Sequence, residues 1–374
     1  MIANNEQVFV NATTSISALG KQKDLTGSKD SNITLSSIPV ENHHALFYAL
    51  KDTPLNKSFE LMMDLLYEQV ESLLEQTQFS RSELKNTMLF IGSTSLDIGC
   101  IKPNSTKEIW LSQTDKIGQL LVSHFSLHSL HYTFNTACTA GANALLYATN
   151  FIKQRKTEHA IVIGFEFFNQ LSINGFDSLD LISNTSVKPF SPLRDGLILG
   201  EGIGAVLLSK KQTERTQLEV MGGYSSCDDY SLTITDEEGN HIVNVIEKSL
   251  LNANITLQEI NLIKVHGTAS IKSDLAEYNA ICKLFIHMPK VFALKPLIGH
   301  TLGACGVIEL ALTDYFTQNA YLPLFTYQNE STEQLLLPFI ASANQLPQEP
   351  IMLFNHFGFG GNNAALIIKK LENT

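Results

Sequence analysis

The feature that most constrains the fold of this chain is an alternation of apolar strands and helices that runs through the sequence twice. The first run comprises a helix at 59–76, strands at 87–94 and 131–137, a helix at 138–154, and strands at 160–166 and 202–209. After a polar stretch at 210–217, the second run comprises a strand at 218–226, a helix at 240–254, a strand at 262–268, a helix at 274–285, the segment 291–300, a helix at 305–316, and strands near 350–354 and 364–369. Alternating strands and helices predict a mainly parallel sheet covered on both faces. Two runs of similar rhythm predict a duplicated α/β unit, divided into residues 1–215 and 216–374.

Length and composition agree with a large globular α/β protein. The 374 residues suffice for two domains or for one large unit with a substantial core. Apolar residues make up 44% and charged residues 17%, whereas disorder requires fewer apolar residues and a higher charge density. The amino-terminal segment lacks a basic stretch followed by an apolar one, and no apolar run approaches the length of about 18 residues that a membrane span needs. We therefore expect a cytoplasmic protein without a secretory signal or a membrane span.

Net charge and cysteine content argue against several classes of function. A net charge of −11 argues against general nucleic-acid binding, which requires a basic surface. The five cysteines are odd in number and widely separated, and they form no CxxC pair. This spacing argues against a zinc site and a disulfide framework, so no metal is expected. It suits a reducing compartment in which one thiol is reactive and the others are packing residues.

One cysteine occupies a position that favours reactivity. In the segment TACTAGANAL (136–145), a predicted strand delivers Cys138 to the first turn of a helix made of small residues. Unpaired backbone N–H groups and the positive end of the helix dipole stabilise a thiolate there, so we expect a lowered pKa for Cys138. A thiolate is the nucleophile in acyl transfer. The alternative is a buried cysteine that packs as a small apolar residue, and this segment alone does not choose between the two.

Two histidines and a glycine-rich segment are placed where a shared site can form. His266 lies at the end of an apolar strand in VHGTAS (265–270), and His300 lies in the glycine-rich turn of LKPLIGHTLGACG (294–306). Each histidine alone is typical of a structural residue, but the carboxyl ends of strands are where α/β sheets build active sites. In NHFGFGGNNAAL (355–366), three glycines permit close backbone approach and can direct N–H groups at an oxyanion, or they can form a tight structural turn.

Together these segments resemble one family, the elongating β-ketoacyl-[acyl carrier protein] synthases of the thiolase superfamily. The resemblance runs from about residue 85 to the carboxyl terminus and keeps the order and spacing of the family's motifs. The matching segments are TACTAGA (136–142), PFSPLRDGLILGEGIGAVLL (189–208), HGTAS (266–270), KPLIGHTLGACGVIE (295–309) and FGFGGNNA (357–364). The resemblance implies a thiolase fold, in which two related α/β halves form a five-layered αβαβα core, and it implies a protein that is usually dimeric.

The resemblance also implies a mechanism. Cys138 would accept an acyl group from the phosphopantetheine arm of an acyl carrier protein, and this arm, which arrives with the partner, is the only cofactor expected. His266 and His300, as neutral imidazoles, would assist decarboxylation of a malonyl-carrier protein, whose carbanion attacks the acyl-Cys138 thioester. Backbone N–H groups of Cys138 and Phe359 would form the oxyanion hole. Two histidines mark the elongating branch, because starter-type synthases carry one histidine and one asparagine.

Other residues receive roles from the same resemblance. The matching positions are Lys295 and Glu309 for a buried charged support, Asp274 and Glu277 for acidic residues behind the HGT motif, Thr268 and Ser270 for hydroxyls that contact the pantetheine arm, and Phe359 for a mobile gate with glycine hinges. A lysine buried in such a site needs a partner to remain charged.

The implied partner sets a condition on surface charge. Carrier proteins are acidic, so docking on a chain of net charge −11 needs a local basic patch. The visible clusters are Lys153, Arg155 and Lys156, and then Lys210 and Lys211. An ordinary solvated surface is the alternative role for each cluster.

The amino-terminal part departs from the family. Cys138 lies earlier in the chain than the family pattern places it, and VFVNATTSISALG (8–20) replaces a glycine-rich opening strand. In the family the region before this cysteine builds dimer contacts and lines the acyl pocket, so acyl chain length and the choice between a homodimer and a heterodimer stay open. The segment EFFNQLSINGFDSLDLIS (166–183) resembles condensing enzymes of bacterial aryl-polyene and related polyketide-like pathways, in which synthases can pair as unlike subunits.

Three alternatives remain at this point. A partner subunit that sets chain length would keep the fold with little activity, but Cys138, His266, His300 and Lys295 are all retained. A degradative thiolase acting on coenzyme A esters needs a second reactive cysteine in the final glycine-rich segment, where this chain has His356 and no cysteine. A non-catalytic binding scaffold gives no reason for the whole set of residues.

Overall fold

The computed structural model of the chain describes residues 6–25, 33–41, 43–101, 115–231, 235–319, 322–323, 335–340 and 348–372. The described strands are β1 (Phe9–Ser17), β2 (Gly20–Lys21), β3 (Leu35–Pro39), β4 (His44–Tyr48), β5 (Thr87–Gly92), β6 (His131–Phe134), β7 (His159–Glu166), β8 (Leu199–Gly200), β9 (Gly202–Ser209), β10 (Leu218–Cys227), β11 (Ile260–Lys264), β12 (Lys290–Phe292), β13 (Ile351–Gly358) and β14 (Asn362–Lys370). The described α-helices are α1 (Phe59–Glu75), α2 (Arg81–Lys85), α4 (Lys116–Phe125), α5 (Ala140–Lys153), α6 (Gln170–Asp177), α7 (Asn240–Ala253), α8 (Ile271–Leu284), α9 (Lys295–Ile298) and α10 (Cys305–Gln318).

Two sets of five strands share one order and one pattern of directions. The first set runs β1-β9-β7-β5-β6 across the sheet, and the second runs β10-β14-β13-β11-β12. If the strands of each set are numbered along the chain, both sets have the order first, fifth, fourth, second, third. In both sets the two pairs nearest the junction are antiparallel and the two outer pairs are parallel. This shared topology is the structural sign of a duplicated α/β unit.

The two sets join through β1 and β10. These strands pair antiparallel, so the sets form a single 11-stranded sheet when β2 is included. All nine residues of β1 are buried, although its segment departs from the family's glycine-rich strand. The predicted division at residue 215 falls between β9 and β10. That the two halves are separate units stays a prediction.

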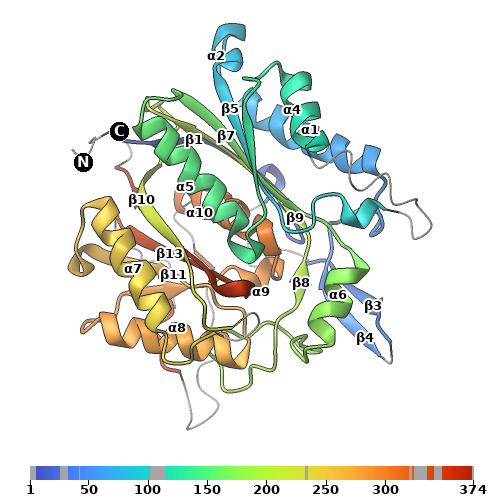
Figure 1. Cartoon of the computed structure of the whole chain (residues 1–374), viewed down its shortest axis with the longest axis vertical. Helices are drawn as coiled ribbons and strands as arrows, with labels where there is room; N and C mark the ends of the chain where they lie inside the picture. The colour runs from blue at the N-terminus through green and yellow to red at the C-terminus, as the bar shows by residue number, and fades with distance from the viewer. Residues whose placement is uncertain are drawn as a thin grey trace.

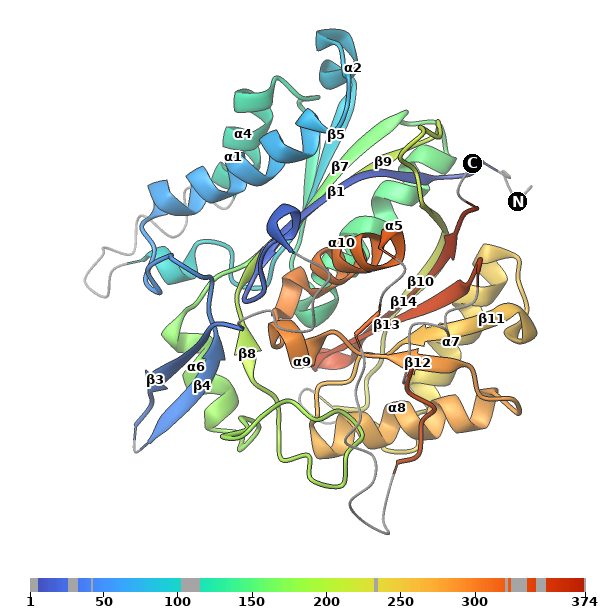
Figure 2. The same ribbon diagram turned by 180° about the vertical axis from the view of Figure 1, so that it is seen from behind.

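Helices cover and separate the two sets of strands, as Figures 1 and 2 show. Helices α1 and α4 pack on the outer face of the first set, and α7 and α8 cover the outer face of the second. Helices α5 and α10 lie between the sets, and α10 is buried on all sides, as expected for a central helix. The predicted αβαβα arrangement is therefore confirmed.

The two central helices touch where each begins. A Cβ added to Gly141 of α5 would lie 2.8 Å from the backbone oxygen of Gly303, and a Cβ added to Gly306 of α10 would lie 2.3 Å from the backbone nitrogen of Ala142. Glycine at these positions allows the helix ends to approach more closely than any side chain would permit. Because Cys138 precedes α5 and His300 precedes α10, this contact brings the two residues together.

The structure corrects several expectations from sequence. The sheet is mixed rather than mainly parallel, because the first and last strands of each half pair antiparallel. The glycine-rich segment 355–366 is largely a hairpin of β13 and β14, with its turn at Phe359–Gly361. The sequence analysis predicts no element at β3, β4, α4 or α6, all of which are short segments of five to ten residues.

Candidate active site

A sharp turn presents Cys138 just before α5. The backbone reaches Ala137 with a φ of +49°, a left-handed conformation that alanine adopts only under constraint, and Cys138 follows in a 3-10 turn. The helix itself begins at Ala140 rather than at the cysteine. Cys138 is 5% exposed, and Gly358 lies against it, since a Cβ there would come within 3.1 Å of the Cys138 nitrogen. The fold thus holds this thiol in a tight and mostly buried position.

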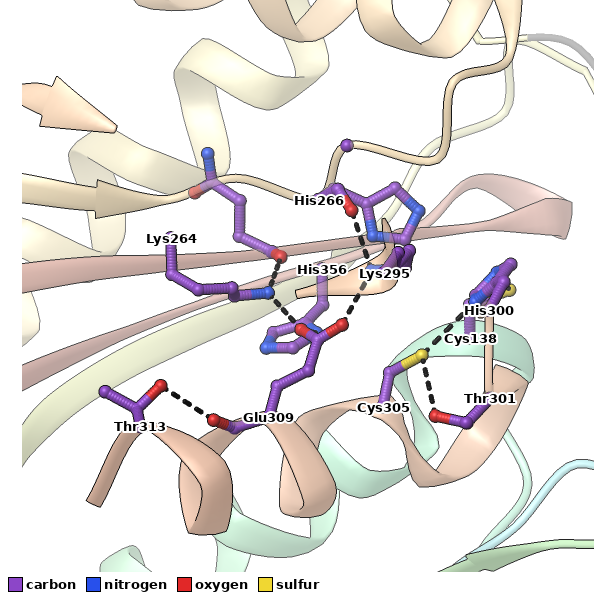
Figure 3. Close-up of polar contacts among 12 residues, drawn as sticks. Cys138, Lys264, His266, Lys295, His300, Thr301, Cys305, Glu309, Thr313 and His356 are labelled. Atoms are coloured by element: carbon purple, nitrogen blue, oxygen red, sulfur yellow. Dashed lines mark hydrogen bonds and ion pairs between the residues drawn. The ribbon is translucent and has the colours of Figure 1, made fainter. Parts of the chain in front are cut away.

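Both predicted histidines line the same pocket as Cys138, and Figure 3 shows their arrangement. His300 Nε2 is 3.1 Å from Cys138 Sγ. The rings of His266 and His300 meet edge to face, with 5.5 Å between their centroids. His266 lies just beyond the end of β11, and His300 follows Gly299, whose φ of +69° ends α9. The predicted set of one cysteine and two histidines is therefore brought together.

A buried group of charged residues lies beneath the histidines. Lys295 Nζ contacts Glu309 Oε1 at 2.8 Å and donates a hydrogen bond to the backbone oxygen of His266 at 2.7 Å. The second oxygen of Glu309 contacts Lys264 Nζ at 2.5 Å, and His356 Nδ1 lies 3.8 Å from the same oxygen. Sequence reasoning found the pair of Lys295 and Glu309 but missed Lys264 and gave His356 no role here. A lysine inside the apolar strand LIKVHGT was the available signal.

The charges of this group depend on one another. Burial lowers the pKa of Lys264 even with Glu309 beside it. Burial also opposes the charge on Lys295, but the Glu309 carboxylate outweighs it and raises the pKa of Lys295. Burial would raise the pKa of Glu309, yet the two ammonium groups hold that pKa below its ordinary value. One carboxylate thus balances two lysines, and the group adds positive potential below the histidines.

Two further carboxylates hold the turn that carries His266. Glu277 accepts hydrogen bonds from the backbone N–H groups of His266 and Gly267, at 2.8 and 3.0 Å. Asp274 accepts one from the backbone N–H of Ala269, at 3.2 Å, and Ala269 has a left-handed φ of +65°. The two acidic residues that follow the HGT motif therefore fix the backbone of the turn.

Both histidines are neutral in this setting. Burial, followed by the positive charge of Lys295, holds the pKa values of His266 and His300 well below the ordinary value of about 6.5. An imidazole that stays neutral can accept a proton at one nitrogen or donate a hydrogen bond from the other. This meets the requirement that the implied mechanism places on the two histidines.

The expectation of a lowered pKa for Cys138 is wrong. Burial raises the pKa of Cys138 to about 12, while Lys295 and the backbone N–H of Phe359 act in the opposite direction. Loss of hydration of the thiolate therefore outweighs the N–H groups at the start of α5. The thiol needs a base to become a nucleophile, and His300 Nε2 is placed to accept its proton.

A pocket of about 430 Å³ leads to the thiol. Thr268, Ser270 and Phe359, which were predicted to bind substrate, line it together with Cys138. Phe359 stacks on Phe176 of α6, with ring centroids 5.2 Å apart and an angle of 21° between the rings. The predicted gate residue thus has an aromatic partner from a helix that sequence reasoning did not identify.

The basic clusters suggested by the sequence do not line this pocket. Lys153 donates a hydrogen bond to the backbone oxygen of Met221. Arg155 and Lys210 both form ion pairs with Glu6. Lys153 lies at the end of α5 opposite to Cys138, so these charges are a helix length away from the thiol.

The described parts of the chain lack two kinds of feature that would point to other functions. No helix there is long and apolar enough to cross a membrane. Among the same residues, no three His, Cys, Asp or Glu side chains are grouped as a metal site would require.

Family models match most of the chain. The model described as beta-ketoacyl synthase, N-terminal domain, matches residues 48–214, and the model described as beta-ketoacyl synthase, C-terminal domain, matches residues 218–326. The chain belongs to the β-ketoacyl synthase family. Strand β1 precedes the first matched residue, although this family member places it at the centre of its sheet.

Relatives and solved structures support this assignment. The 3-oxoacyl-[acyl-carrier-protein] synthase 2 of Rhizobium meliloti is 29% identical over 276 residues, which are 68% of this chain and 63% of that protein. The chain spans less than two thirds of the length of the curated relatives that it matches.

The overall fold is that of known ketosynthases. A chain of the complex between the ketosynthase ApeO and its chain length factor ApeC, from Xenorhabdus doucetiae, has a TM-score of 0.76 and 21% identity, with 98% of both chains covered. A chain of the AntDE:AntF complex, a type II PKS acyl-carrier protein with its ketosynthase bound to the hexaketide, has a TM-score of 0.84 and 17% identity, with 98% of this chain and 100% of that chain covered. The predicted thiolase fold is confirmed.

Proposed function

We propose that this chain is a β-ketoacyl-[acyl carrier protein] synthase, which joins an acyl group held on Cys138 to a malonyl unit with loss of CO₂. The observation that carries the proposal is the approach of His300 Nε2 to 3.1 Å from Cys138 Sγ, in a pocket that His266 also lines. A thiol, an adjacent neutral base and a second neutral imidazole are the groups that a condensation by way of an acyl-enzyme needs.

The first half-reaction loads the acyl group. The Cys138 thiol gives its proton to His300 Nε2, and the sulfur attacks the thioester carbonyl of an acyl-carrier protein. Backbone N–H groups of Cys138 and Phe359 stabilise the oxyanion, and the N–H of Phe359 already points at the Cys138 sulfur. The new carbon–sulfur bond at Cys138 forms as the bond to the pantetheine sulfur breaks, and that sulfur takes the proton from His300.

The second half-reaction extends the chain. A malonyl-carrier protein enters, and His266 and His300 donate hydrogen bonds to its thioester carbonyl. The malonyl carboxylate leaves as CO₂, and the electrons of the broken bond form an enolate that both imidazoles stabilise. The enolate carbon attacks the acyl-Cys138 carbonyl, and the Cys138 thiolate leaves and takes a proton from solvent, which restores the thiol. Neutral imidazoles serve this step because each has one N–H to donate.

The cofactor in this proposal is the phosphopantetheine arm of the carrier protein, and no other is needed. The arm would pass the hydroxyl groups of Thr268 and Ser270, which line the pocket together with Cys138. Both hydroxyls can pair with the amide groups of such an arm.

The mouth of the pocket is the surface that we assign to the carrier protein. Ile271 lines the pocket and is 59% exposed, and Lys272 beside it also lines the pocket. Arg194 Nη2 donates a hydrogen bond to the backbone oxygen of Ile271 at 3.4 Å, and the adjacent Leu193 is 51% exposed. Apolar and basic side chains therefore lie together at the mouth. Lys272 pairs there with exposed Glu237 at 3.3 Å, and a carboxylate of an acidic partner can take the place of this surface contact.

This surface gives a direct test of docking. Charge reversal of Lys272 to Glu should lower kcat/KM for acyl-carrier protein by about tenfold, because two like charges would then meet at the interface. The same change should leave the reaction with an acyl-pantetheine thioester unaltered. Lys156→Glu, in the cluster far from the pocket, is the matched control and should change neither reaction. An equal loss of kcat/KM with both substrates would contradict the assignment of the carrier protein to this surface.

A second ketosynthase chain is the other proposed partner. Strand β6 is the outermost strand of its set and has no neighbour on one side within the described residues. Around it, Leu130 is 57% exposed, Tyr132 is 37% exposed and Tyr147 of α5 is 49% exposed. An apolar edge strand is a ready surface for pairing with another chain, either a copy of this one or an unlike subunit.

A chain-length subunit with little activity is the rival function, and the geometry weighs against it. Such a subunit has no need for a thiol in contact with a neutral base. Here Cys138, both histidines and the support of Lys295 on the His266 backbone are all assembled in one pocket.

The proposal is tested by following product. Purified protein, alone and with a co-expressed sister synthase, is incubated with acyl-carrier protein and malonyl-carrier protein. We expect release of CO₂ and a carrier protein whose mass corresponds to the β-ketoacyl product. Cys138→Ala should form no such product. If the wild-type protein forms no product under either condition with acyl groups of several lengths, the proposed condensation activity is contradicted.

A further inference from the structure

Cys305 has a position in the site that the proposed reaction leaves without a role. It is the first residue of α10 and is fully buried. Its sulfur lies 3.2 Å from His300 Nδ1, on the side of the ring opposite to Cys138, and Thr301 Oγ1 donates a hydrogen bond to it at 3.4 Å (Figure 3). The imidazole of His300 is therefore held between two thiols, one at each ring nitrogen.

Cys305 remains a protonated thiol under working conditions. Burial raises the pKa of Cys305 to about 11, although Lys295 nearby acts in the opposite direction. A thiol has one hydrogen to donate and lone pairs to accept with, so it can pair with either form of an imidazole nitrogen. A backbone N–H or C=O group in the same place could pair with only one form.

The two half-reactions make opposite demands on His300. To accept the proton of Cys138, Nε2 must be free of hydrogen, so the ring hydrogen is on Nδ1. To donate a hydrogen bond to the malonyl thioester, Nε2 must carry the hydrogen, so Nδ1 is bare. A neutral imidazole carries a single N–H, so a change at Nε2 requires the reverse change at Nδ1.

We propose that Cys305 is a positioning residue that supports both neutral tautomers of His300. While Cys138 is a free thiol facing Nε2, the Cys305 sulfur accepts a hydrogen bond from Nδ1–H. Once Cys138 has no hydrogen to offer, His300 loses its Nδ1 hydrogen to water and takes a proton from water at Nε2. Cys305 then donates its S–H to the bare Nδ1, so the Nε2–H tautomer becomes favoured. This inference rests on the proposed function in one respect, that Cys138 is the group that becomes acylated.

The second histidine of the site provides a contrast. Nδ1 of His266 is buried and has no hydrogen-bond partner among the described residues. No described residue therefore hydrogen-bonds to Nδ1 of His266 to select its tautomer, whereas both ring nitrogens of His300 contact a sulfur atom. The difference assigns proton acceptance from Cys138 to His300 and confines His266 to the malonyl step.

The test is the tautomer of His300, observed by two-bond ¹H–¹⁵N correlation NMR of histidine-labelled protein. Its signals are assigned by their loss in His300→Gln. We expect Nδ1–H in the wild-type protein and Nε2–H in Cys138→Ala, which has no thiol to face Nε2. Cys305→Ala and the double variant Cys138→Ala/Cys305→Ala should both have the Nε2–H tautomer, because Nδ1 has lost the partner that accepted its hydrogen. Cys305→Ser should restore the change, because a hydroxyl also both donates and accepts.

The outcomes separate this inference from the proposed function. The role of Cys305 would be overturned if wild-type and Cys138→Ala protein had the same His300 tautomer. It would also be overturned if loss of Cys138 still changed the tautomer in protein that carries Cys305→Ala. These measurements need no turnover, so their result stands whether or not condensation is detected. Cys282→Ala, which removes an exposed thiol on α8, is the matched control. It should leave the His300 tautomer unchanged, both in the wild-type background and in Cys138→Ala.

Kinetics provide a second readout that a purely structural role would not affect. Cys305→Ala should slow acyl transfer to Cys138 by about three- to tenfold, the size expected for the loss of one hydrogen bond. Decarboxylation by protein whose Cys138 is already acylated should be unchanged, because that step uses the Nε2–H tautomer that this variant retains. Equal slowing of both steps would contradict the proposal. A thermal melt of each variant shows whether the fold is intact.

Discussion

The two halves of the molecule share one strand order, yet they contribute very different chemistry. The amino-terminal half supplies a single reacting atom, the sulfur of Cys138 ahead of α5. The carboxyl-terminal half supplies both histidines and the charged residues beneath them. The duplicated frame determines where strand ends and helix starts lie, and the side chains placed there decide what the site can do.

Each half also buries a contact between lysine and glutamate, and the two contacts differ in their surroundings. Lys57 Nζ is 2.7 Å from Glu201 Oε2, and that carboxylate accepts hydrogen bonds from two backbone N–H groups of neighbouring loops. In the other half, Glu309 pairs with two lysines directly below the histidine turn. We infer that the first contact ties chain segments together, whereas the second also controls charge at the site.

The largest expected effect separates the contributions of the two histidines. His266→Ala should slow malonyl decarboxylation by about 10²- to 10⁴-fold, the usual loss when a positioned acid–base group is removed. Acyl transfer to Cys138 should change far less, because the histidine in hydrogen-bond contact with the sulfur is His300 and not His266. The two steps are measured separately, by CO₂ release and by the mass of the acylated protein. Similar losses of rate in both steps would contradict the assignment of acyl transfer to His300 and of decarboxylation to both histidines. His287→Ala, at an exposed position, serves as the control.

The next effect tests the difference between the two buried contacts. Lys57→Met and Lys264→Met should each lower the free energy of unfolding by about 3–5 kcal/mol. The first removes the ammonium group that pairs with buried Glu201, and the second removes one of the two that pair with buried Glu309. Only Lys264→Met should also shift the acid limb of the decarboxylation rate to higher pH, because removal of that ammonium raises the pKa values of His266 and His300. Urea unfolding and a pH–rate profile measure the two quantities. A profile that shifts equally in both variants would erase the distinction between the halves.

The smallest effect concerns the response of stability to acid. His266, His300 and His356 of the second half all have pKa values well below the ordinary one, mainly through burial. The unfolded chain takes up protons as the pH falls through about 6.5 and the folded chain does not, so the free energy of unfolding should fall with pH below that value. His356→Met removes one titrating ring and should reduce this slope by up to about 1.4 kcal/mol per pH unit. Urea titrations at pH 5 to 7 measure the slope, and an unchanged slope would contradict the assignment of a neutral buried His356.

The sequence predicted the fold and the central triad because their signals are local. Apolar periods predict most strands and helices, and the segments around Cys138, His266 and His300 each end a strand or begin a helix. Strand β1 was harder to recognise, because its Thr and Ser side chains look half exposed although the strand is buried on both faces. Thr13, for example, is satisfied by a hydrogen bond to Asp314, which is distant in the chain.

Properties that depend on distant contacts could not be read from the sequence. The pKa of Cys138 follows from burial by both halves, which outweighs the local effect of the helix start. Lys264 lies in an apolar strand with nothing nearby in the sequence to indicate Glu309 as its partner. Phe176 meets Phe359 only because α6 and the β13–β14 turn converge at the pocket.

The most direct test of the account is whether Cys138 becomes acylated. The protein is incubated with acyl-carrier protein and examined by intact-protein mass spectrometry, with Cys138→Ala as the control and Cys305→Ala as a second thiol variant. We predict a mass increase of one acyl group that is absent in Cys138→Ala and present, though formed more slowly, in Cys305→Ala. An acyl group that persists in Cys138→Ala, or no acyl group on the wild-type protein with any chain length, would contradict the account.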